Sequence, residues 1–260
     1  MCENCGCREG NEKKYFANHT HTHADGTTHT HPGSDSHHHH HHETPAKTVT
    51  VQQNILAEND KTAAETRLFL KERGIIAVNM ISSPGSGKTM LLEKTLQMLQ
   101  GKLKCAVITG DQQTDNDAER LKGKGAAVVQ IKTKSACHLN AEQVASVLPD
   151  IIENDTKLLF IENVGNLVCP AAFDLGENFK IALLSVTEGE DKPAKYPVLF
   201  SDAQIVLLTK TDLIPHLDWN KSLCRKYIRD IKPGVFIFEL SARSGDGMQE
   251  WTEYLAGLTS

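Results

Sequence analysis

Residues 82–89 read Ser-Ser-Pro-Gly-Ser-Gly-Lys-Thr and stand between a short apolar run and the segment MLLEKTLQML, which has a helical pattern. Small residues let backbone N–H groups curl around a phosphate, and the N-terminus of the following helix adds its dipole. Lys88 would then bridge the β- and γ-phosphates of a nucleotide, while Thr89 would offer its hydroxyl to Mg²⁺. Ser82 stands where this pattern has Gly, and the alternative interpretation is a tight turn with a surface lysine. The predicted nucleotide contacts here are Gly85, Ser86, Gly87, Lys88 and Thr89.

A second element, Thr-Lys-Thr-Asp at residues 209–212, follows a later apolar run and would select the base. The Asp212 carboxylate can accept hydrogen bonds from both N1–H and the 2-amino group of guanine, whereas adenine would leave this charge unpaired. The stem of Lys210 would cover one face of the base, and the backbone of Ser241 and Ala242 would approach the guanine oxygen. GTP is therefore the expected nucleotide, and a plain solvated helix start is the alternative.

Two carboxylates between these elements are candidates for Mg²⁺. Asp111 lies in Gly-Asp-Gln-Gln-Thr-Asp-Asn-Asp and Glu162 begins Glu-Asn-Val-Gly, each at the end of a predicted strand. The N–H of Gly165 would contact the γ-phosphate. An N-cap is the alternative role for Asp111, with Asp115 and Asp117 as further candidates, and a salt bridge is the alternative for Glu162. The predicted catalytic set is Lys88, Asp111, Glu162 and Gly165, and the predicted Mg²⁺ ligands are Thr89, Asp111 and Glu162.

The N-terminus offers soft metal ligands. It reads Met-Cys-Glu-Asn-Cys-Gly-Cys, so Cys2, Cys5 and Cys7 lie beside the α-amino group. Four N and S donors suit square-planar Ni²⁺, and tetrahedral Zn²⁺ would also accept them. A redox Cys-x-x-Cys needs a surrounding strand and helix, and the pattern here predicts neither. The alternative to metal binding is that these cysteines are incidental.

Histidines dominate the segment that follows, at His19, His21, His23, His29, His31 and residues 37–42. A six-histidine run is also the pattern of a cloning tag, but this run lies inside a longer His-Thr-His series. Many imidazoles on a flexible chain give weak, exchangeable sites, which favours metal storage.

A third cluster lies near the predicted nucleotide site. Cys137 and His138 follow a predicted strand, and Cys169 lies four residues past Gly165. A metal ligand on a loop that senses the γ-phosphate would couple the nucleotide state to metal binding. Three ligands are one short of a closed tetrahedral site, so water or a second subunit would complete it. Buried cysteines and a loop histidine are the alternative, which is also our interpretation of Cys105 and Cys224.

The elements that must position these residues form a doubly wound α/β fold. Continuous apolar runs predict a mainly parallel sheet covered on both faces by helices; they lie at residues 75–81, 104–109, 126–131, 158–161, 181–186, 204–208 and 235–239. Residues 51–73 have a partly amphipathic pattern that predicts a helix closed by Gly74. We expect a disordered Cys- and His-rich tail over residues 1–50 and a nucleotide-hydrolysing domain over residues 51–260.

Composition narrows the partners. The net charge of −5 argues against nucleic acid and membrane surfaces as partners, and no apolar run reaches the length of a membrane span. We expect a cytoplasmic location, where seven cysteines are metal ligands or buried thiols and not a disulfide framework.

The combined motifs resemble the hydrogenase nickel-incorporation GTPases, the HypB family, over nearly the whole chain. The resemblance implies a phosphate-loop fold of the signal-recognition and MinD-like class, GTP-dependent homodimers and slow hydrolysis. It also implies delivery of Ni²⁺ to the large subunit of [NiFe]-hydrogenase, together with a small zinc-containing partner of the HypA type.

Two other functions stay open at this point. A urease-type nickel GTPase would share the nucleotide motifs, but we would expect a Cys-Pro-His motif that this chain lacks. A nickel storage protein with a vestigial GTPase is the second, and the intact Lys88, Thr89 and Asp212 argue against it.

Overall fold

The computed structural model describes residues 19–22, 28–31, 45–111, 116–133 and 136–259, and the chain divides into two compact units, residues 1–53 and 54–260. In the first unit β1 (His19–Thr22) pairs antiparallel with β2 (Thr28–His31), and His19 stands opposite His31. This strand pair falls within the predicted tail, where alternating β-branched threonines favour extended backbone. The tail as a separate disordered domain stays a prediction. Cys2, Cys5, Cys7, His23 and residues 37–42 lie outside the described residues.

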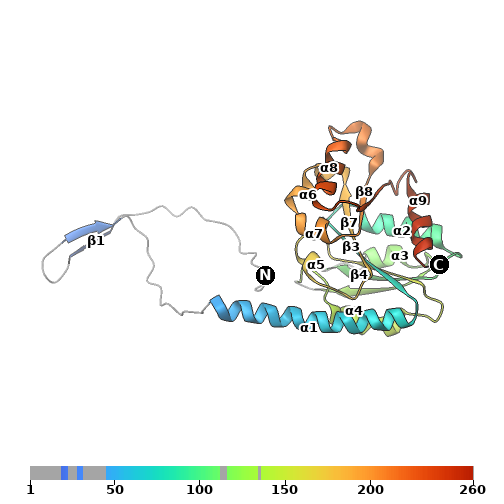
Figure 1. Cartoon of the computed structure of the whole chain (residues 1–260), viewed down its shortest axis with the longest axis horizontal. Helices are drawn as coiled ribbons and strands as arrows, with labels where there is room; N and C mark the ends of the chain where they lie inside the picture. Colours follow the sequence, from blue (N-terminus) through green and yellow to red (C-terminus); the bar gives the residue numbers. More distant parts are fainter. Residues whose placement is uncertain (1–18, 23–27, 32–44, 112–115, 134–135, 260) are drawn as a thin grey trace. The chain divides into compact units, whose positions relative to one another are not determined.

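The second unit is built on a parallel sheet of seven strands in the order β5-β4-β6-β3-β7-β8-β9 (Figure 1). The strands are β3 (Ile76–Ser82), β4 (Cys105–Asp111), β5 (Ala126–Lys132), β6 (Leu158–Glu162), β7 (Phe179–Ser185), β8 (Ile205–Thr209) and β9 (Phe236–Glu239). Every predicted strand is confirmed within two residues at either end. Most of their side chains are buried on both faces, which is why their sequences are continuously apolar.

Helices cover both faces of this sheet. They are α1 (Pro45–Glu72), α2 (Lys88–Leu99), α3 (Asn116–Leu121), α4 (Ala141–Ile151), α5 (Cys169–Ala172), α6 (Lys192–Lys195), α7 (Pro197–Asp202), α8 (Lys221–Ile231) and α9 (Met248–Leu258). Two 3₁₀ turns, η1 (Val186–Glu188) and η2 (Thr211–His216), follow β7 and β8. Among the described residues, no helix combines the length and apolarity that crossing a bilayer requires.

The period-2 alternation of the strands divides the core between the two faces. Val78 and Met80 face α2, α3 and α9, whose buried side chains include Leu92, Leu121 and Trp251. On the other face α1 and α4 cover one half of the sheet, and α7 and α8 cover the other half. Figure 1 shows α1 and α4 side by side along the sheet. The fold class predicted from sequence is therefore confirmed.

Helix α1 begins six residues before its predicted start and ends one residue before its predicted end. Pro45 is its first residue, a position where the missing N–H of proline costs no helical hydrogen bond. The helix is fixed to the domain at Gly176, where a Cβ would lie 2.8 Å from the carbonyl oxygen of Ala63 and 2.7 Å from Cγ2 of Thr66. Arg67 adds an ion pair to Asp174, in which Nη2 alone donates to both carboxylate oxygens at 2.6 and 2.7 Å.

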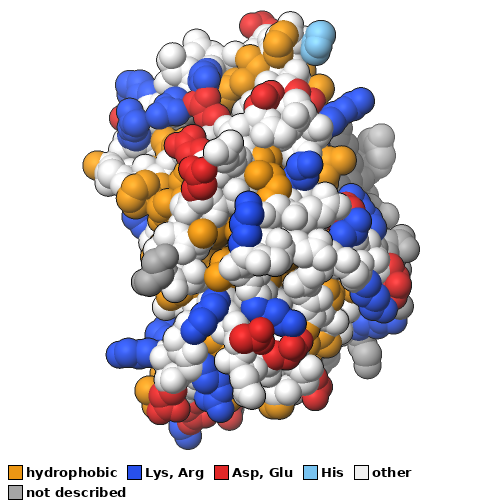
Figure 2. Space-filling view, turned by 90° about the vertical axis from the view of Figure 1, so that its right-hand side faces the viewer, with side chains coloured by type: hydrophobic (Ala, Val, Ile, Leu, Met, Phe, Trp, Pro, Cys, Tyr) orange, Lys and Arg blue, Asp and Glu red, His pale blue; other side chains and the backbone are white. Residues whose placement is uncertain are grey.

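Charges of both signs are interspersed over the face drawn in Figure 2, where Lys and Arg side chains stand beside Asp and Glu. This face therefore presents neither a continuous basic nor a continuous acidic surface.

Candidate nucleotide and metal site

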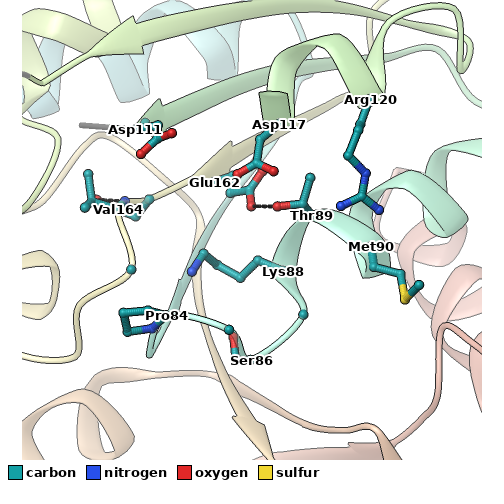
Figure 3. Close-up of a pocket in the computed structure, with 15 residues that line it drawn as sticks. Pro84, Ser86, Lys88, Thr89, Met90, Asp111, Asp117, Arg120, Glu162 and Val164 are labelled. Atoms are coloured by element: carbon teal, nitrogen blue, oxygen red, sulfur yellow. Dashed lines mark hydrogen bonds between the residues drawn. The ribbon is translucent and has the colours of Figure 1, made fainter. Parts of the chain in front are cut away.

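The segments singled out by sequence meet at the carboxyl edge of the sheet. Adjacent strands end at Asp111 (β4), Glu162 (β6) and Ser82 (β3), while the Cys-His pair follows β5 and the Thr-Lys-Thr-Asp segment, the predicted guanine element, lies at the end of β8. Parallel strands bring all their carboxyl ends to one edge, which is the usual ligand site of open α/β sheets. A cavity of about 500 Å³ opens there (Figure 3). It is lined by residues of the loop at positions 82–89, which we call the phosphate loop, and by Asp111 and residues 162–165.

The phosphate loop has the backbone that anion binding requires. Gly85 and Gly87 have φ values of 73° and 98°, in the left-handed region that favours glycine. Ser82, in contrast, has no positive φ, so this position does not need the glycine of the usual pattern. Its hydroxyl accepts a hydrogen bond from Nζ of Lys88 at 2.7 Å and another from Ser86. The departure from the pattern thus adds an internal partner that holds Lys88 in the cavity, where burial lowers the pKa of its ammonium.

An oxygen-rich group lies beside the loop. Oγ1 of Thr89 donates to Oε1 of Glu162 at 2.7 Å, and Oε2 of Glu162 is buried without a hydrogen-bond partner. Burial raises the pKa of Glu162 to about 7, although the Thr89 hydrogen bond and Lys88 lower it. Figure 3 shows the carboxylate of Asp117 next to that of Glu162, and Asp111 lines the same cavity. A hydroxyl with several carboxylates, one carrying an orphaned oxygen, fits the oxygen ligands that Mg²⁺ prefers.

The structure bears on the alternative roles of the two carboxylates. Helix α3 begins at Asn116, so Asp111 is too distant in sequence to be its N-cap. Among the described residues Glu162 lies in no ion pair within 4.0 Å. Both residues line the cavity, and their binding of Mg²⁺ stays a prediction.

Gly165 lies against the phosphate loop. A Cβ on this residue would stand 3.1 Å from Cα and 3.2 Å from N of Pro84. A Cβ at these separations would crowd the loop, so glycine suits this position, and contact of its N–H with a γ-phosphate stays a prediction.

A second cavity, of about 290 Å³, contains the predicted base-binding residues Lys210, Asp212, Ser241 and Ala242, and it shares Ser86, Gly87 and Met90 with the first. Ser241 Oγ donates to Oδ1 of Asp212 at 2.6 Å, which orients the carboxylate. Lys210 has a φ of 59° and donates from Nζ to the carbonyl of Gly85 at 2.7 Å, so its stem runs between the two cavities. The two cavities therefore adjoin at the phosphate loop, which is the arrangement expected for a phosphate end and a base end of one nucleotide site.

The third cluster follows β5 and β6, whereas the predicted base-binding segment lies at the end of β8, toward the other edge of the sheet. The ligand atoms of Cys137, His138 and Cys169 all lie within 4.8 Å of one another, and Cys137 Sγ is 3.7 Å from Nδ1 of His138. The imidazole stacks on Phe173 with ring centroids 3.9 Å apart. Burial lowers the pKa of His138, which favours the neutral form that binds metals. Two thiols and an imidazole at this separation can converge on one soft ion.

Three residues at this site, Arg120, Phe173 and Asn163, were not found from sequence, and Asp117 was named there only as a further candidate beside Asp111. Asp117 and Arg120 line the phosphate cavity from α3, and Arg120 Nη2 contacts Oε2 of Glu93 at 3.0 Å. Asp117 and Arg120 are three residues apart, so they share one face of α3, and this spacing was the available signal. Phe173 and Asn163 carried no such signal, because their roles depend on contacts with distant segments.

Cys105 and Cys224 are buried, and burial raises the pKa of each thiol to about 12. Their interpretation as small apolar core residues agrees with these environments.

Comparison with known proteins places this geometry in a family. Residues 76–239 match the family model described as "CobW/HypB/UreG, nucleotide-binding domain". The hydrogenase maturation factor HypB of Azotobacter vinelandii is 50% identical over 210 residues, 81% of this chain and 69% of the relative. HypB of Escherichia coli K12 is 46% identical over 209 residues, 80% of this chain and 72% of the relative.

Two solved structures are also similar. HypB from Helicobacter pylori in complex with nickel superposes with a TM-score of 0.73 at 37% identity, covering 78% of this chain and 95% of that one. HypB from Archaeoglobus fulgidus gives a TM-score of 0.74 at 36% identity, covering 79% and 100%. On its fold, its nucleotide-site geometry and these relatives, the chain belongs to the HypB hydrogenase maturation factors within the CobW/HypB/UreG family.

Proposed function

We propose that this protein is a GTP-hydrolysing nickel metallochaperone, which binds Ni²⁺ at Cys137, His138 and Cys169 and releases it under the control of GTP for [NiFe]-hydrogenase maturation. The observation that carries the proposal is that Cys169 and Gly165 belong to one short segment, with Gly165 against the phosphate loop and Cys169 beside His138. A nucleotide that moves this segment also moves a metal ligand.

The base end of the site supports GTP. Ser241 leaves Asp212 oriented toward the cavity as a charged acceptor, and guanine supplies two adjacent donors for it. Adenine would leave that acceptor unpaired, at a cost of about 1–3 kcal/mol or more for a charged group. Lys88, with its backbone cradle, would balance the phosphate charge, and Mg²⁺ held by Thr89, Glu162 and Asp111 would neutralise the charge that develops on the β- and γ-oxygens.

The metal end supports a soft cargo ion. Two thiolates and a neutral imidazole suit Ni²⁺, and also Zn²⁺, and the related H. pylori protein is in complex with nickel. Three ligands leave a coordination position open, which a second protomer or a partner protein would fill. Val168, 63% exposed, stands directly before Cys169 and would lie in such an interface. We therefore include a GTP-dependent homodimer, a HypA-type accessory protein and the hydrogenase large subunit in the proposal.

The deciding experiment uses the full chain with Cys2, Cys5 and Cys7 replaced by Ala, so that sulfur-to-nickel charge-transfer absorption reports the internal site alone. Nickel affinity is measured by chelator competition with GDP and then with a non-hydrolysable GTP analogue. We expect the two affinities to differ by at least fivefold, within the usual range of coupling between sites. Cys169→Ala should weaken the absorption band and remove its dependence on the nucleotide, whereas the matched control Cys224→Ala should retain both.

Equal affinities in the two nucleotide states would refute GTP control of nickel at this site. The storage alternative makes a different prediction: Lys88→Ala would then abolish GTP turnover and leave hydrogenase maturation intact.

A further inference from the structure

Asn163 occupies the point where the nucleotide segment and the metal segment touch. It follows Glu162 at the end of β6 and is 1% exposed. Its Oδ1 accepts two backbone hydrogen bonds, from the N–H of Val164 at 3.0 Å and from the N–H of Leu139 at 3.1 Å. Val164 precedes Gly165, and Leu139 follows His138. A single oxygen atom therefore joins the segment that faces the γ-phosphate to the segment that carries two metal ligands.

Leu139 is held on its other side as well. Its side chain is fully buried and fills the space above Gly110, where a Cβ would lie 2.8 Å from Cγ of Leu139. Gly110 precedes Asp111, so the side chain of Leu139 packs on the β4 end of the nucleotide site. Through its N–H, bound to Asn163, and its side chain, packed on Gly110, Leu139 contacts two segments of the nucleotide site.

The amide end of Asn163 fixes the direction of its oxygen. Nδ2 donates to Oδ1 of Asn79 at 3.2 Å, and Nδ2 of Asn79 donates to Oε1 of Glu177 at 3.1 Å. Asn79 and Glu177 are also buried. Turning the amide of Asn163 over would place its NH₂ against two N–H donors and its oxygen against an acceptor, leaving buried groups unpaired. The orientation is therefore set by its neighbours.

We propose that Asn163 is the positioning residue through which the nucleotide state sets the geometry of the Cys137, His138 and Cys169 site. This inference rests on the proposed function. A γ-phosphate that draws in the N–H of Gly165 displaces the adjacent Val164, whose N–H shares its acceptor with Leu139. The displacement reaches His138 through one peptide unit, while Cys169 moves with the same segment as Gly165. All three ligands then respond together, although none of them is among the residues that line the nucleotide cavity.

The test compares nickel affinity with GDP and with the non-hydrolysable GTP analogue, again in the full chain with Cys2, Cys5 and Cys7 replaced by Ala. Asn163→Ala removes the shared acceptor, and we expect the ratio of the two affinities to fall below twofold. Asn163→Asp keeps an oxygen in place for both N–H groups and should retain at least half of the parent's ratio. Asn178→Ala is the matched control, because Oδ1 of Asn178 also accepts a backbone N–H, from Ala77 at 2.8 Å, away from both segments. It should leave the ratio unchanged.

A second measurement needs no substitution. In the parent protein, exchange of the Leu139 amide hydrogen should differ at least fivefold between the GDP and GTP-analogue states, because the acceptor of that hydrogen is displaced. The inference is overturned if Leu139 exchanges equally in both states, or if a folded Asn163→Ala keeps the parent's ratio. Either result leaves the proposed function intact as long as the parent shows a ratio of fivefold or more. A parent ratio of one overturns both the coupling in the proposed function and this inference.

Discussion

Replacing Glu162 by Gln should stabilise the protein when nucleotide and metal are both removed, and the gain should depend on pH. The carboxylate is buried, one of its oxygens has no hydrogen-bond partner, and its pKa is raised from 4.5 to about 7. The folded protein therefore holds a proton that the unfolded chain releases. Between these two pKa values stability falls as the pH rises, and above pH 7 the whole cost is present.

The magnitude follows from the same two values. A difference of about 2.5 pH units, at about 1.4 kcal/mol for each, corresponds to about 3 kcal/mol at pH 8 and to almost nothing at pH 4. Glutamine is uncharged and can still accept the hydrogen bond from Thr89. Glu162→Gln should consequently raise the free energy of unfolding by about 3 kcal/mol at pH 8 and by well under 1 kcal/mol at pH 4.5.

The assay is urea unfolding in excess chelator at the two pH values. Glu93→Gln is the control, because hydrogen bonds from Lys124 and Arg120 lower the pKa of Glu93 against a smaller opposing effect of burial. Its stabilising contribution is present at pH 8 and is lost as the pH falls, so this variant should be destabilised at pH 8. A Glu162→Gln gain that is equal at both pH values, or a loss at pH 8, would show that burial of the charge is not the cause. With Mg²⁺ and the GTP analogue present the order should reverse, because the variant loses a proposed ligand of Mg²⁺.

Three further predictions concern other parts of the site and fold. Asp212→Asn should weaken guanine nucleotide binding by at least a hundredfold in competition assays, since two charge-assisted hydrogen bonds of about 1.5–3 kcal/mol each are lost. Xanthosine triphosphate has an oxygen at position 2 that accepts from the new amide, so it should bind this variant better than GTP does. An unchanged preference for GTP would contradict the assignment of Asp212. Gly247→Ala should lower the free energy of unfolding by more than about 3 kcal/mol, because a Cβ would lie 2.1 Å from the carbonyl oxygen of Glu239 and φ is 69°. Gly245→Ala, at φ 92° with open space, should cost only about 1–2 kcal/mol, and equal losses would refute the steric argument. Iodoacetamide at pH 8 should modify Cys137 and Cys169, and bound Ni²⁺ should protect both thiols from this reaction. The buried Cys105 and Cys224 should stay unmodified until urea is added. Mass spectrometry of the peptides measures the modification, and reaction of Cys105 or Cys224 without urea would contradict their burial.

The sequence by itself determined the strands and the phosphate loop, and it predicted an element for guanine that stays a prediction. Each of these depends on local chemistry: continuous apolar runs for buried strands, glycines where φ is positive, and a carboxylate with its flanking lysine for the base. Their residues are neighbours in the chain, so a pattern of a few positions contains the whole element.

Only the tertiary structure decided the strand order, and with it the contacts between segments that are distant in sequence. The order β5-β4-β6-β3 places the Cys-His pair after β5 close to Cys169, which follows β6. The fold also brings Asp117 beside Glu162. It places Asn163 where its side chain accepts hydrogen bonds from both Val164 and Leu139. Parallel strands are joined through long crossovers, so no local pattern specifies which carboxyl ends become neighbours. The packing of the whole sheet against its helices determines the strand order. The strand order in turn determines which side chains lie close enough to act together.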